Sequence, residues 1–419
     1  MTGLKPPPLR DDCFALPAGI DWTPVDDALA LLREKLRPVV GQEKSPLSGA
    51  LGRVLATPLV AARSNPPQAN TAVDGYGFAY ASLGDGDQVL PLVEGRAAAG
   101  APFPRQVPPG YAVRMLTGAA LPDGVDTVIL QEDVTVGDGE IAFRAGLKAG
   151  ANTRKAGEDV AAGDTVLKAG RTLTAADLAL IAAVGLSQVE VFQRLKVAVV
   201  STGDELVDAG EPAGPGQIYD ANRPMLSGLV QGFGFETIDL GKVPDNRKAL
   251  RKALDDAADR ADVVLTSGGA SSGDEDHVSA LLTEAGAMTE WRIAVKPGRP
   301  LALGMWQGTP VFGLPGNPVA AMVCTLIFAR PAMAVLAGAG WSAPQSFDVP
   351  AAFSKSKKPG RREYLRARIR DGQAEVFKSE GSGRISGLSW AEGLVELPDA
   401  AAEIRQGDPV RFIPLTSFS

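Results

Sequence analysis

Residues 263–273 read VVLTSGGASSG, and this stretch decides the fold because an apolar run ends directly in a glycine-rich loop. The loop leads into Asp274, Glu275 and Asp276, and a helical apolar stripe begins at Val278. A strand, a glycine loop and a helix in this order gather free backbone N–H groups at one point, as in many phosphate sites. Glycine after a strand can also serve only to turn the chain, so a single loop of this kind is weak support.

Two further loops of related character follow. Residues 294–300 read AVKPGRP and place Lys296 and Arg299 on a turn stiffened by proline. Residues 312–318 read FGLPGNP and end in an Asn cap and a first-turn Pro before an apolar helix. Three such loops, with acids on one and bases on another, predict a site for a phosphorylated ligand.

The composition describes a folded protein of several domains without a general polyanion-binding surface. The 419 residues carry 42 basic and 49 acidic side chains, a net charge of −7, which disfavours nucleic acid and acidic membranes as partners. Only Cys13 and Cys324 are present, so we expect no disulfide framework and a reducing, cytoplasmic compartment. His277 is the single histidine, so any metal should be a hard cation held by carboxylates.

The pattern of apolar residues predicts four domains. Strands and helices alternate from Lys196, and we expect a doubly wound α/β domain over 195–341. Residues 64–163 show short apolar runs between Gly, Pro and Asp, which predict a β-rich insertion. It should interrupt a discontinuous helical unit for linking and dimerisation, residues 1–63 and 164–194. Short strands over 342–419 predict a small C-terminal β-barrel domain.

Three helices are predicted in some detail. The first spans 23–37, with Thr23 as its cap, and the second spans 174–184, with Thr174 as its cap and Asp177 in its first turn. The apolar run 319–329 is followed by Arg330 and Pro331, which should break it. That run is too short to cross a membrane and should be a buried helix.

Carboxylates at strand ends are candidate ligands. Glu205 and Asp204 follow the expected strand 197–200 at its carboxyl end, where ligands of such sheets bind. One acid of the group 274–276 could coordinate Mg²⁺ beside a bound phosphate. Turn capping by Asp204 and solvation of Glu205 are the alternative interpretation.

A basic stretch stands out in the C-terminal domain. Residues 353–370 are rich in Lys and Arg within an acidic protein, and Tyr364, Arg366, Arg368 and Arg370 share one face if this segment is a strand. The pattern predicts an arginine ladder, and a solvated edge strand is the alternative.

Taken in order, these motifs resemble molybdopterin molybdenumtransferases, the group that contains MoeA and the gephyrin E domain. The resemblance covers nearly the whole chain. It rests on residues 70–77, 115–118, 131–132, 157–159, 201–206, 216–220, 222–223, 266–269, 296–300 and 314–318.

The resemblance implies an enzyme that inserts molybdenum from molybdate into adenylylated molybdopterin and releases AMP and molybdenum cofactor, with Mg²⁺ required. It also implies an elongated homodimer whose site lies between the α/β domain of one subunit and the β insertion of the other. Transient contact with the adenylyltransferase or with molybdoenzyme acceptors is expected, and no membrane contact.

Site residues are carried over by motif. The resemblance implies catalytic roles for Asp74, Thr117, Asp159, Glu205, Asp245 and Asp276, with Glu205, Asp245 and Asp276 as metal ligands. It implies substrate contacts for Ser267, Gly268, Gly269, Arg292, Lys296, Arg299, Pro315, Pro318, Arg366 and Ser382. Arg292 departs from a lysine found among relatives, and His277 stands where an aromatic residue is common.

Two other functions stay open. A molybdopterin adenylyltransferase would use a similar α/β domain but would leave 64–162 and 342–419 without a purpose. A gephyrin-like scaffold that binds receptor tails is the second alternative, and no fused partner domain is visible in its favour.

Overall fold

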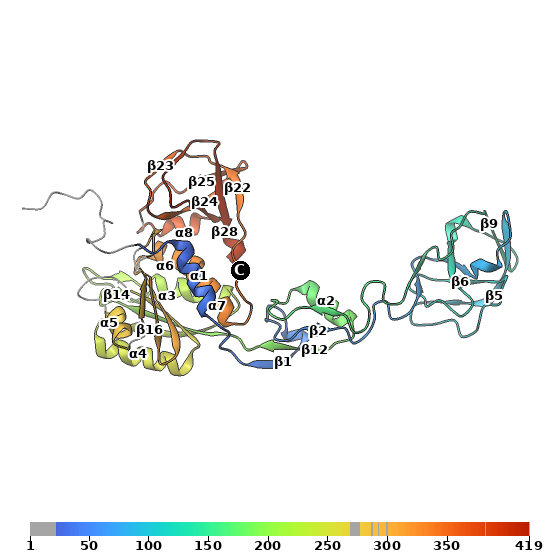
Figure 1. The fold of residues 1–419 in the computed structure, drawn as a ribbon, viewed down its shortest axis with the longest axis horizontal. Helices are drawn as coiled ribbons and strands as arrows, with labels where there is room; N and C mark the ends of the chain where they lie inside the picture. Colours follow the sequence, from blue (N-terminus) through green and yellow to red (C-terminus); the bar gives the residue numbers. More distant parts are fainter. Residues whose placement is uncertain are drawn as a thin grey trace, which may run out of the picture. The chain divides into compact units, whose positions relative to one another are not determined.

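A computed structural model describes residues 22–268, 277–285, 288–291, 293–298, 301–381 and 383–418 (Figure 1). It divides into two compact units. One comprises Glu43–Val191, and the other comprises Met1–Gln42 together with Phe192–Ser419. Each unit has its own apolar cores, so each is described by itself.

The larger unit contains a six-stranded mixed sheet. Four parallel strands come first in the sheet order, followed by two antiparallel strands at the other edge. Every residue of the two middle parallel strands β17 and β21 is buried, as expected of strands covered on both faces. The order is β16 (Glu236–Val243), β13 (Lys196–Thr202), β17 (Val263–Ser267), β21 (Thr309–Leu314), β20 (Leu301–Trp306), β18 (Met288–Trp291).

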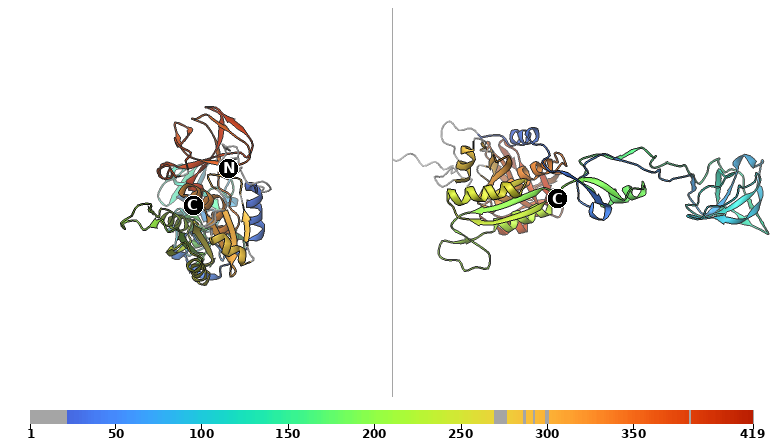
Figure 2. Two further views of the ribbon diagram at one scale, coloured as in Figure 1. Left: turned by 90° about the vertical axis from the view of Figure 1, so that its left-hand side faces the viewer. Right: turned by 90° about the horizontal axis from the view of Figure 1, so that it is seen from below.

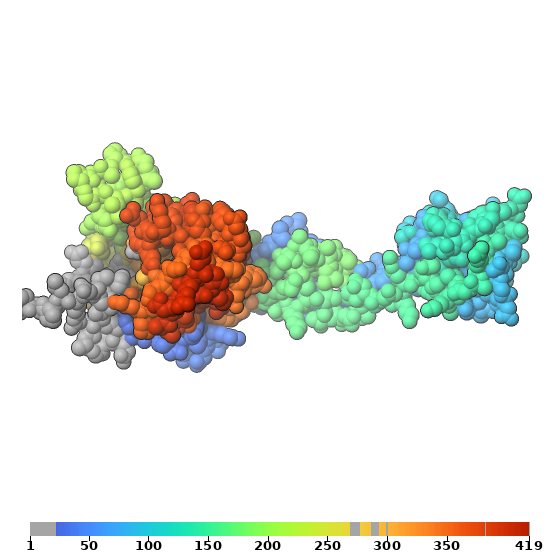
Figure 3. Space-filling model, turned by 90° about the horizontal axis from the view of Figure 1, so that it is seen from above, coloured from blue at the N-terminus to red at the C-terminus, as the bar shows by residue number. Residues whose placement is uncertain are grey.

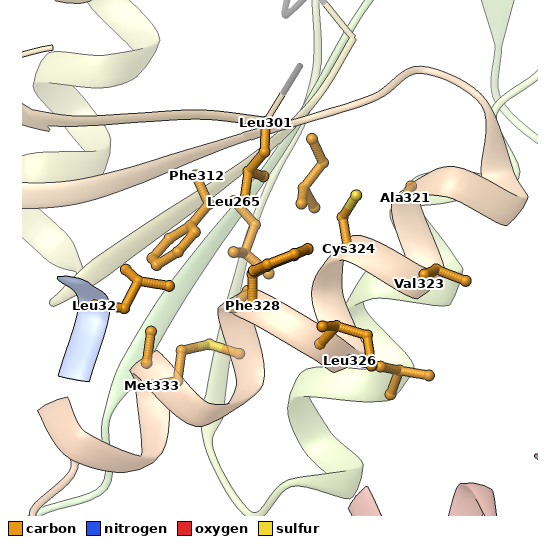
Figure 4. Packing of buried hydrophobic residues seen from close by; sticks show 14 of the residues in the cluster. Leu32, Leu265, Leu301, Phe312, Ala321, Val323, Cys324, Leu326, Phe328 and Met333 are labelled. Atoms are coloured by element: carbon orange, nitrogen blue, oxygen red, sulfur yellow. The ribbon is translucent and has the colours of Figure 1, made fainter. Parts of the chain in front are cut away.

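Helices cover both faces of this sheet, as a doubly wound domain requires (Figure 2). On one face, α4 (Arg247–Arg260) and α5 (His277–Glu284) bury their leucines against the strands. The other face is covered by α3 (Asn222–Gly232), α6 (Pro318–Cys324), α7 (Arg330–Leu336) and α1 (Val25–Lys35). Figure 4 shows the second core, where Phe312 of the sheet meets Leu32 of α1 and Phe328. The predicted α/β architecture is confirmed.

Helix α1 differs from its prediction in two ways. It begins at Val25 with Pro24 at its cap position, so no side chain caps it, and the backbone of Thr23 forms a bridge with Ile293. Val25, Ala28 and Leu32 of its apolar stripe are buried in the core of the α/β domain. The prediction that this helix belongs to one unit with residues 164–194 is therefore wrong. An amphipathic helix packs on the apolar surface within its reach, which here is the sheet.

The predicted break after residue 329 is also wrong. A π-helical turn over Thr325–Ala329 joins α6 to α7, so Pro331 falls in the first turn of α7, where a missing N–H costs little. Among the described residues, this single helical stretch, Pro318–Leu336, is long and apolar enough to cross a membrane by length and composition alone. It is 89% buried inside the protein, as expected for a core helix.

The smaller unit contains the β-rich segment. Its six-stranded sheet has the order β7 (Thr127–Leu130), β4 (Gly75–Phe78), β6 (Ala112–Met115), β5 (Gln88–Ala97), β9 (Glu140–Phe143), β8 (Thr135–Val136). A separate apolar cluster packs on each face, one of them built on the stacked rings of Phe78 and Phe143, 5.1 Å apart. Gly75 is required here, since a Cβ would lie 1.9 Å from the Ile129 carbonyl oxygen.

The remainder of the smaller unit has one described α-helix, α2 (Ala175–Ala183). Its predicted capping box is present, because Thr174 and Asp177 exchange side-chain to backbone hydrogen bonds. Short strand pairs make up the rest: β1 (Gln42–Pro46) with β12 (Gln188–Phe192), β2 (Leu59–Val60) with β11 (Thr165–Leu167), and β3 (Asn70–Thr71) with β10 (Thr153–Arg154). Strands of two to five residues are too short to show a repeating apolar pattern in the sequence. The prediction of a mainly helical unit here is therefore wrong.

The C-terminal residues form a small barrel-like sheet. Its order is β19 (Val295–Lys296), β24 (Arg362–Arg370), β26 (Gly393–Leu397), β28 (Pro409–Pro414), β22 (Phe347–Pro350), with β25 (Gln373–Val376) also on β24. A bridge between Ala351 and Ala374 closes the sheet on itself. A two-stranded pair, β23 (Lys355–Lys357) with β27 (Ala402–Ile404), completes the domain. The predicted β-barrel domain is confirmed.

Arg362 connects this domain to α1 through an ion pair with Asp26. The domain and the helix lie next to each other in Figure 3. Its guanidinium donates to both carboxylate oxygens of Asp26, at 2.7 and 2.8 Å, and to Asp399 at 2.7 Å. The hydrogen bonds from Arg362 lower the pKa of Asp26, even though partial burial acts in the opposite direction.

We expect Asp26→Asn to lower the melting temperature of the larger unit by roughly 2 °C at pH 7, the effect of one exposed ion pair. Because the pKa of Asp26 is depressed in the folded state, this stabilisation is complete above the ordinary pKa of 3.8 and is lost as pH falls through the lower folded value. Melting of both proteins at pH 7, 4.5 and 3 measures this. The exposed neighbour Asp27→Asn is the control, and a difference that persists unchanged at pH 3 contradicts the assignment.

Candidate active site

Two of the three predicted loops meet at the carboxyl edge of the α/β sheet. Ser267, the last residue of β17, is 2% exposed, and the backbone N–H of Gly268 donates to the Leu314 carbonyl at 3.3 Å. Gly268 has φ +92°, and a Cβ there would lie 2.5 Å from the Thr202 carbonyl oxygen. The position therefore accepts only glycine, because three strand ends converge on it.

Asn222 fastens these loops together from the start of α3. Its side-chain amide donates to Ser267 Oγ at 2.6 Å and to the Gly316 carbonyl at 2.7 Å. Asp220 holds Asn222 in place by accepting its backbone N–H at 3.1 Å, and Arg223 pairs with Asp220 and Asp239. The sequence motif contained Asn222 but assigned it no role.

The third loop is built as predicted. Asn317 Oδ1 accepts the backbone N–H groups of Val319 and Ala320, at 3.1 and 3.4 Å, and Pro318 occupies the first turn of α6. Pro315 lies in the same loop, directly after β21. The predicted shape of this loop is confirmed, while the contacts of Pro315 and Pro318 with substrate stay a prediction.

Two predicted carboxylates lie on loops that follow neighbouring strands. Glu205 follows β13, and its carboxylate folds back over Gly203, where an added Cβ would lie 2.6 Å from Oε2. The backbone N–H of Asp245, which follows β16, donates to Asp204 Oδ1 at 3.1 Å. Asp204 therefore joins the two loops, a role closer to the capping alternative than to ligand binding.

Carboxylate oxygens are the donors that Mg²⁺ prefers, so Glu205 and Asp245 have suitable chemistry. The described residues contain no group of three His, Cys, Asp or Glu side chains close enough to hold a metal ion. The third predicted ligand, Asp276, lies outside the described residues, as do the substrate contacts Gly269, Arg292, Arg299 and Ser382. The metal site therefore stays a prediction.

Lys296 lies at the edge of a cavity of about 200 Å³ between its own loop and the C-terminal domain. Its ammonium pairs with Glu380 at 2.9 Å and with Glu363 at 3.3 Å. Burial lowers the pKa of Lys296, but the two carboxylates outweigh it and the pKa is raised, so this lysine is charged at neutral pH. Lys355 pairs with the same two carboxylates, a partnership that the sequence did not reveal.

Arg366 lines this cavity but is 4% exposed. Its guanidinium donates to the carbonyl oxygens of Arg384 at 2.5 Å, Ser379 at 2.6 Å and Gly381 at 3.2 Å, and it stacks over Phe377. Burial lowers its pKa. Arg366 thus anchors the backbone at Ser379, Gly381 and Arg384.

The predicted arginine ladder is wrong as a continuous solvent-facing surface. Tyr364 is buried like Arg366, while Arg368 pairs with Glu375 at 2.8 Å and lies over Trp390. Arg370 pairs with Glu392 at 3.3 Å. This segment is a strand, as the period of two predicts, but this face of β24 packs against the helix that contains Trp390 (α8, Ser386–Trp390).

In the smaller unit, the structure brings Asp74 and Thr117 together from two separate turns. Asp74 Oδ1 accepts the Thr117 backbone N–H at 2.6 Å and the Thr117 hydroxyl at 2.7 Å. These two hydrogen bonds lower the pKa of Asp74 below its usual range, and the bond from the hydroxyl has the larger effect. Asp159, in the same unit, accepts a hydrogen bond from the Asn65 side chain at 3.0 Å.

The predicted site residues therefore divide between the two compact units. Asp74, Thr117 and Asp159 belong to Glu43–Val191, and Glu205, Asp245, Ser267, Lys296 and Arg366 belong to the other. The larger unit thus contains a glycine-lined sheet edge and a lysine-lined cavity, and the smaller unit contains an ionised carboxylate.

Comparison with known proteins defines the class. Three family models match in chain order: the MoeA N-terminal region (domain I and II) over 23–185, the probable molybdopterin binding domain over 198–335, and the MoeA C-terminal region (domain IV) over 348–415. These residues contain every described element of the site.

Individual relatives agree over almost the full length. The molybdopterin molybdenumtransferase of Haemophilus influenzae is 38% identical over 93% of this chain and 98% of its own. The enzyme of that name from Nostoc is 34% identical over 88% of both chains. The crystal structure of a molybdopterin biosynthesis MoeA protein from Pyrococcus horikoshii superposes with a TM-score of 0.82 at 29% identity, covering 94% of this chain and all of that one. The chain belongs to the molybdopterin molybdenumtransferase family.

The Asp74–Thr117 pair gives a direct test. We expect Thr117→Val to raise the pKa of Asp74 towards its usual value, because the variant loses the hydroxyl hydrogen bond that stabilises the carboxylate. The measurement is an NMR pH titration of protein that carries ¹³C-labelled aspartate, with Asp74→Asn to assign the signal. Thr135→Val, at an exposed threonine, should leave the signal unchanged. An identical titration curve in Thr117→Val would show that the hydroxyl does not act on Asp74.

Proposed function

We propose that this chain inserts molybdenum from molybdate into adenylylated molybdopterin and releases AMP and the molybdenum cofactor. The observation that carries this proposal is the carboxyl edge of the α/β sheet, where Asn222 ties two glycine loops together beside Glu205. Backbone N–H groups at such an edge suit a phosphate. The family match over the whole architecture supplies the identity of the substrate.

Different groups of residues are assigned to the adenylylated pterin and to molybdate. Loop contacts to the pterin phosphate and the AMP leaving group are assigned to Ser267, Gly268, Gly269, Arg292, Arg299, Pro315 and Pro318. Molybdate, a substrate here, is assigned to the cavity of Lys296, near the loop that Arg366 holds and that contains Ser382. The observed hydrogen bonds of Arg366 support a positioning role for it, and its direct contact with molybdate stays a prediction.

We assign Mg²⁺ to Glu205, Asp245 and Asp276, on the strength of their oxygen donors. When bound, the ion would neutralise charge on the phosphoanhydride. The carboxylate of Asp74, which its low pKa keeps ionised, and the neighbouring hydroxyl of Thr117 are available to orient groups on the pterin.

The division of site residues between two compact units supports a homodimer with composite sites. In this arrangement, Asp74, Thr117 and Asp159 of one copy face the α/β loops of the other. Residues 64–163 would then act as the insertion domain, and the strand pairs and α2 that adjoin it would act as the linking unit. We place the enzyme in the cytoplasm, in transient contact with the adenylyltransferase and with molybdoenzyme acceptors.

Neither alternative function is proposed. Matches to the MoeA N-terminal and C-terminal regions give a purpose to the segments that an adenylyltransferase would leave unused. For a scaffold function, no observation on the described residues speaks in its favour.

The function predicts AMP release when purified protein receives adenylylated molybdopterin, molybdate and Mg²⁺. Glu205→Gln should reduce the rate by about 10²-fold or more, because a group that stabilises developing charge is lost. Glu236→Gln is the matched control, since Glu236 is exposed at the opposite end of the sheet. Absence of AMP from the unmodified protein contradicts the function, while equal rates for both variants contradict only the role of Glu205.

The dimeric site is tested by subunit mixing. Asp74→Asn and Lys296→Ala proteins should each be inactive, and exchange should restore about a quarter of normal activity, because half of the dimers are hybrids with one intact site of two. Native mass spectrometry establishes that hybrids have formed. Hybrids without activity show that Asp74 and Lys296 of the same copy serve one site.

A further inference from the structure

Four charged side chains form one cluster at the Lys296 cavity: Lys296, Lys355 and Glu380 line it, and Glu363 pairs with both lysines from outside the lining. Glu380 Oε2 lies 2.9 Å from the Lys296 ammonium, and Glu380 Oε1 contacts the ammonium of Lys355. Glu363 bridges the same two lysines, at 3.3 Å to each. Within this cluster two carboxylates balance two ammonium groups, so the remaining positive charge of the cavity lining comes from Arg366 and Lys378.

The two carboxylates differ in how firmly they are held. The side chain of Glu363 is 11% exposed and lies on β24, whose backbone pairs with Lys296 on one side and Leu397 on the other. The side chain of Glu380 is 47% exposed and lies in the loop after β25. Its neighbours Ser379 and Gly381 are anchored by Arg366 through their carbonyl oxygens. Glu380 can therefore rotate into solvent while the loop stays in place.

Glu380 already occupies the cavity as an oxyanion would. Its two oxygens each bind one lysine, which is how two oxygens of a tetrahedral dianion would bind the same pair. Hydrogen bonds from Lys355 and Lys296 lower the pKa of Glu380, against the effect of burial, so it is ionised at neutral pH. Removal of Glu380 would leave one net positive charge among the remaining three groups, next to the guanidinium of Arg366.

We propose that Glu380 is a built-in competitor for the oxyanion seat and that Lys355 is a second oxyanion-binding residue beside Lys296. Molybdate enters by displacing the Glu380 carboxylate from both lysines, and Glu380 returns when the seat is vacated. Because the proposal takes molybdate as the ligand of the Lys296 cavity, it rests on the proposed function. Competition with Glu380 also favours the binding of dianions over monoanions, because a monoanion compensates less fully for the two lysine contacts that Glu380 loses.

Isothermal titration of the full-length protein with molybdate alone tests the competition. We expect Glu380→Gln to bind molybdate about 10-fold more tightly, because a charge-assisted competing contact is worth at least this factor. Glu380→Asp, which keeps the charge but has a shorter reach, should fall between the two. Glu375→Gln is the matched control, since Glu375 pairs with Arg368 on the same strand pair. Equal or weaker binding by Glu380→Gln overturns the proposal.

Lys355 is tested in the Glu380→Gln background, where the competitor is already absent. Lys355→Met should weaken molybdate binding about 10-fold there, and Lys355→Arg should restore most of it. Unchanged affinity in Lys355→Met shows that Lys355 only balances Glu363 and overturns its assignment. The proposed site itself is judged by Lys296→Ala in the otherwise unmodified protein. If that variant binds molybdate normally, the oxyanion lies elsewhere, an outcome distinct from a failure of Glu380→Gln alone.

Discussion

The parallel pairing of Val295 with Arg362 and of Lys296 with Glu363 is the contact on which the lysine-lined cavity depends. It makes a segment of the α/β domain into an edge strand of the C-terminal sheet. Backbone hydrogen bonds of this kind fix register, because a slip by one residue would turn Lys296 away from Glu363. The bidentate ion pair of Arg362 with Asp26 holds the same two domains together from another side. The C-terminal domain therefore contributes Lys355 and Arg366 to the walls of this cavity.

The features that the sequence predicted well are those that local chemistry determines. The strand that ends at Ser267, the capping box at Thr174 and the Asn317 cap all depend on residues close together in the chain. The pairing of Asp74 with Thr117 is not local, and the motif resemblance implied a catalytic role for each residue but no contact between them. Physical reasoning from either turn by itself could not have found the partner.

The errors arose where tertiary contacts decide. A period of two placed Arg366 and Arg368 on one face of β24 but could not tell whether that face was covered by α8 and its loop. The amphipathic stripe of α1 predicted a helix without saying which apolar surface receives it. Lys355, Glu363 and Glu380 stand far from Lys296 in the chain, so their cluster exists only through strand register. A proline within a helix looked like a break because a π-helical turn has no clear sequence signal.

The helix Pro318–Leu336 has a consequence for how the chain is made. Its composition would suit a lipid bilayer, yet all six strands of the sheet that covers it precede it in sequence. During synthesis, this sheet leaves the ribosome first and can receive the helix as it emerges. The cover is finished much later, because Leu394, Ile413 and Phe418 belong to the same core and Arg330 donates to the Phe418 carbonyl at 2.8 Å. A chain that lacked its final residues would expose one side of the apolar helix Pro318–Leu336 to water. Such a chain should aggregate more readily than the full-length protein.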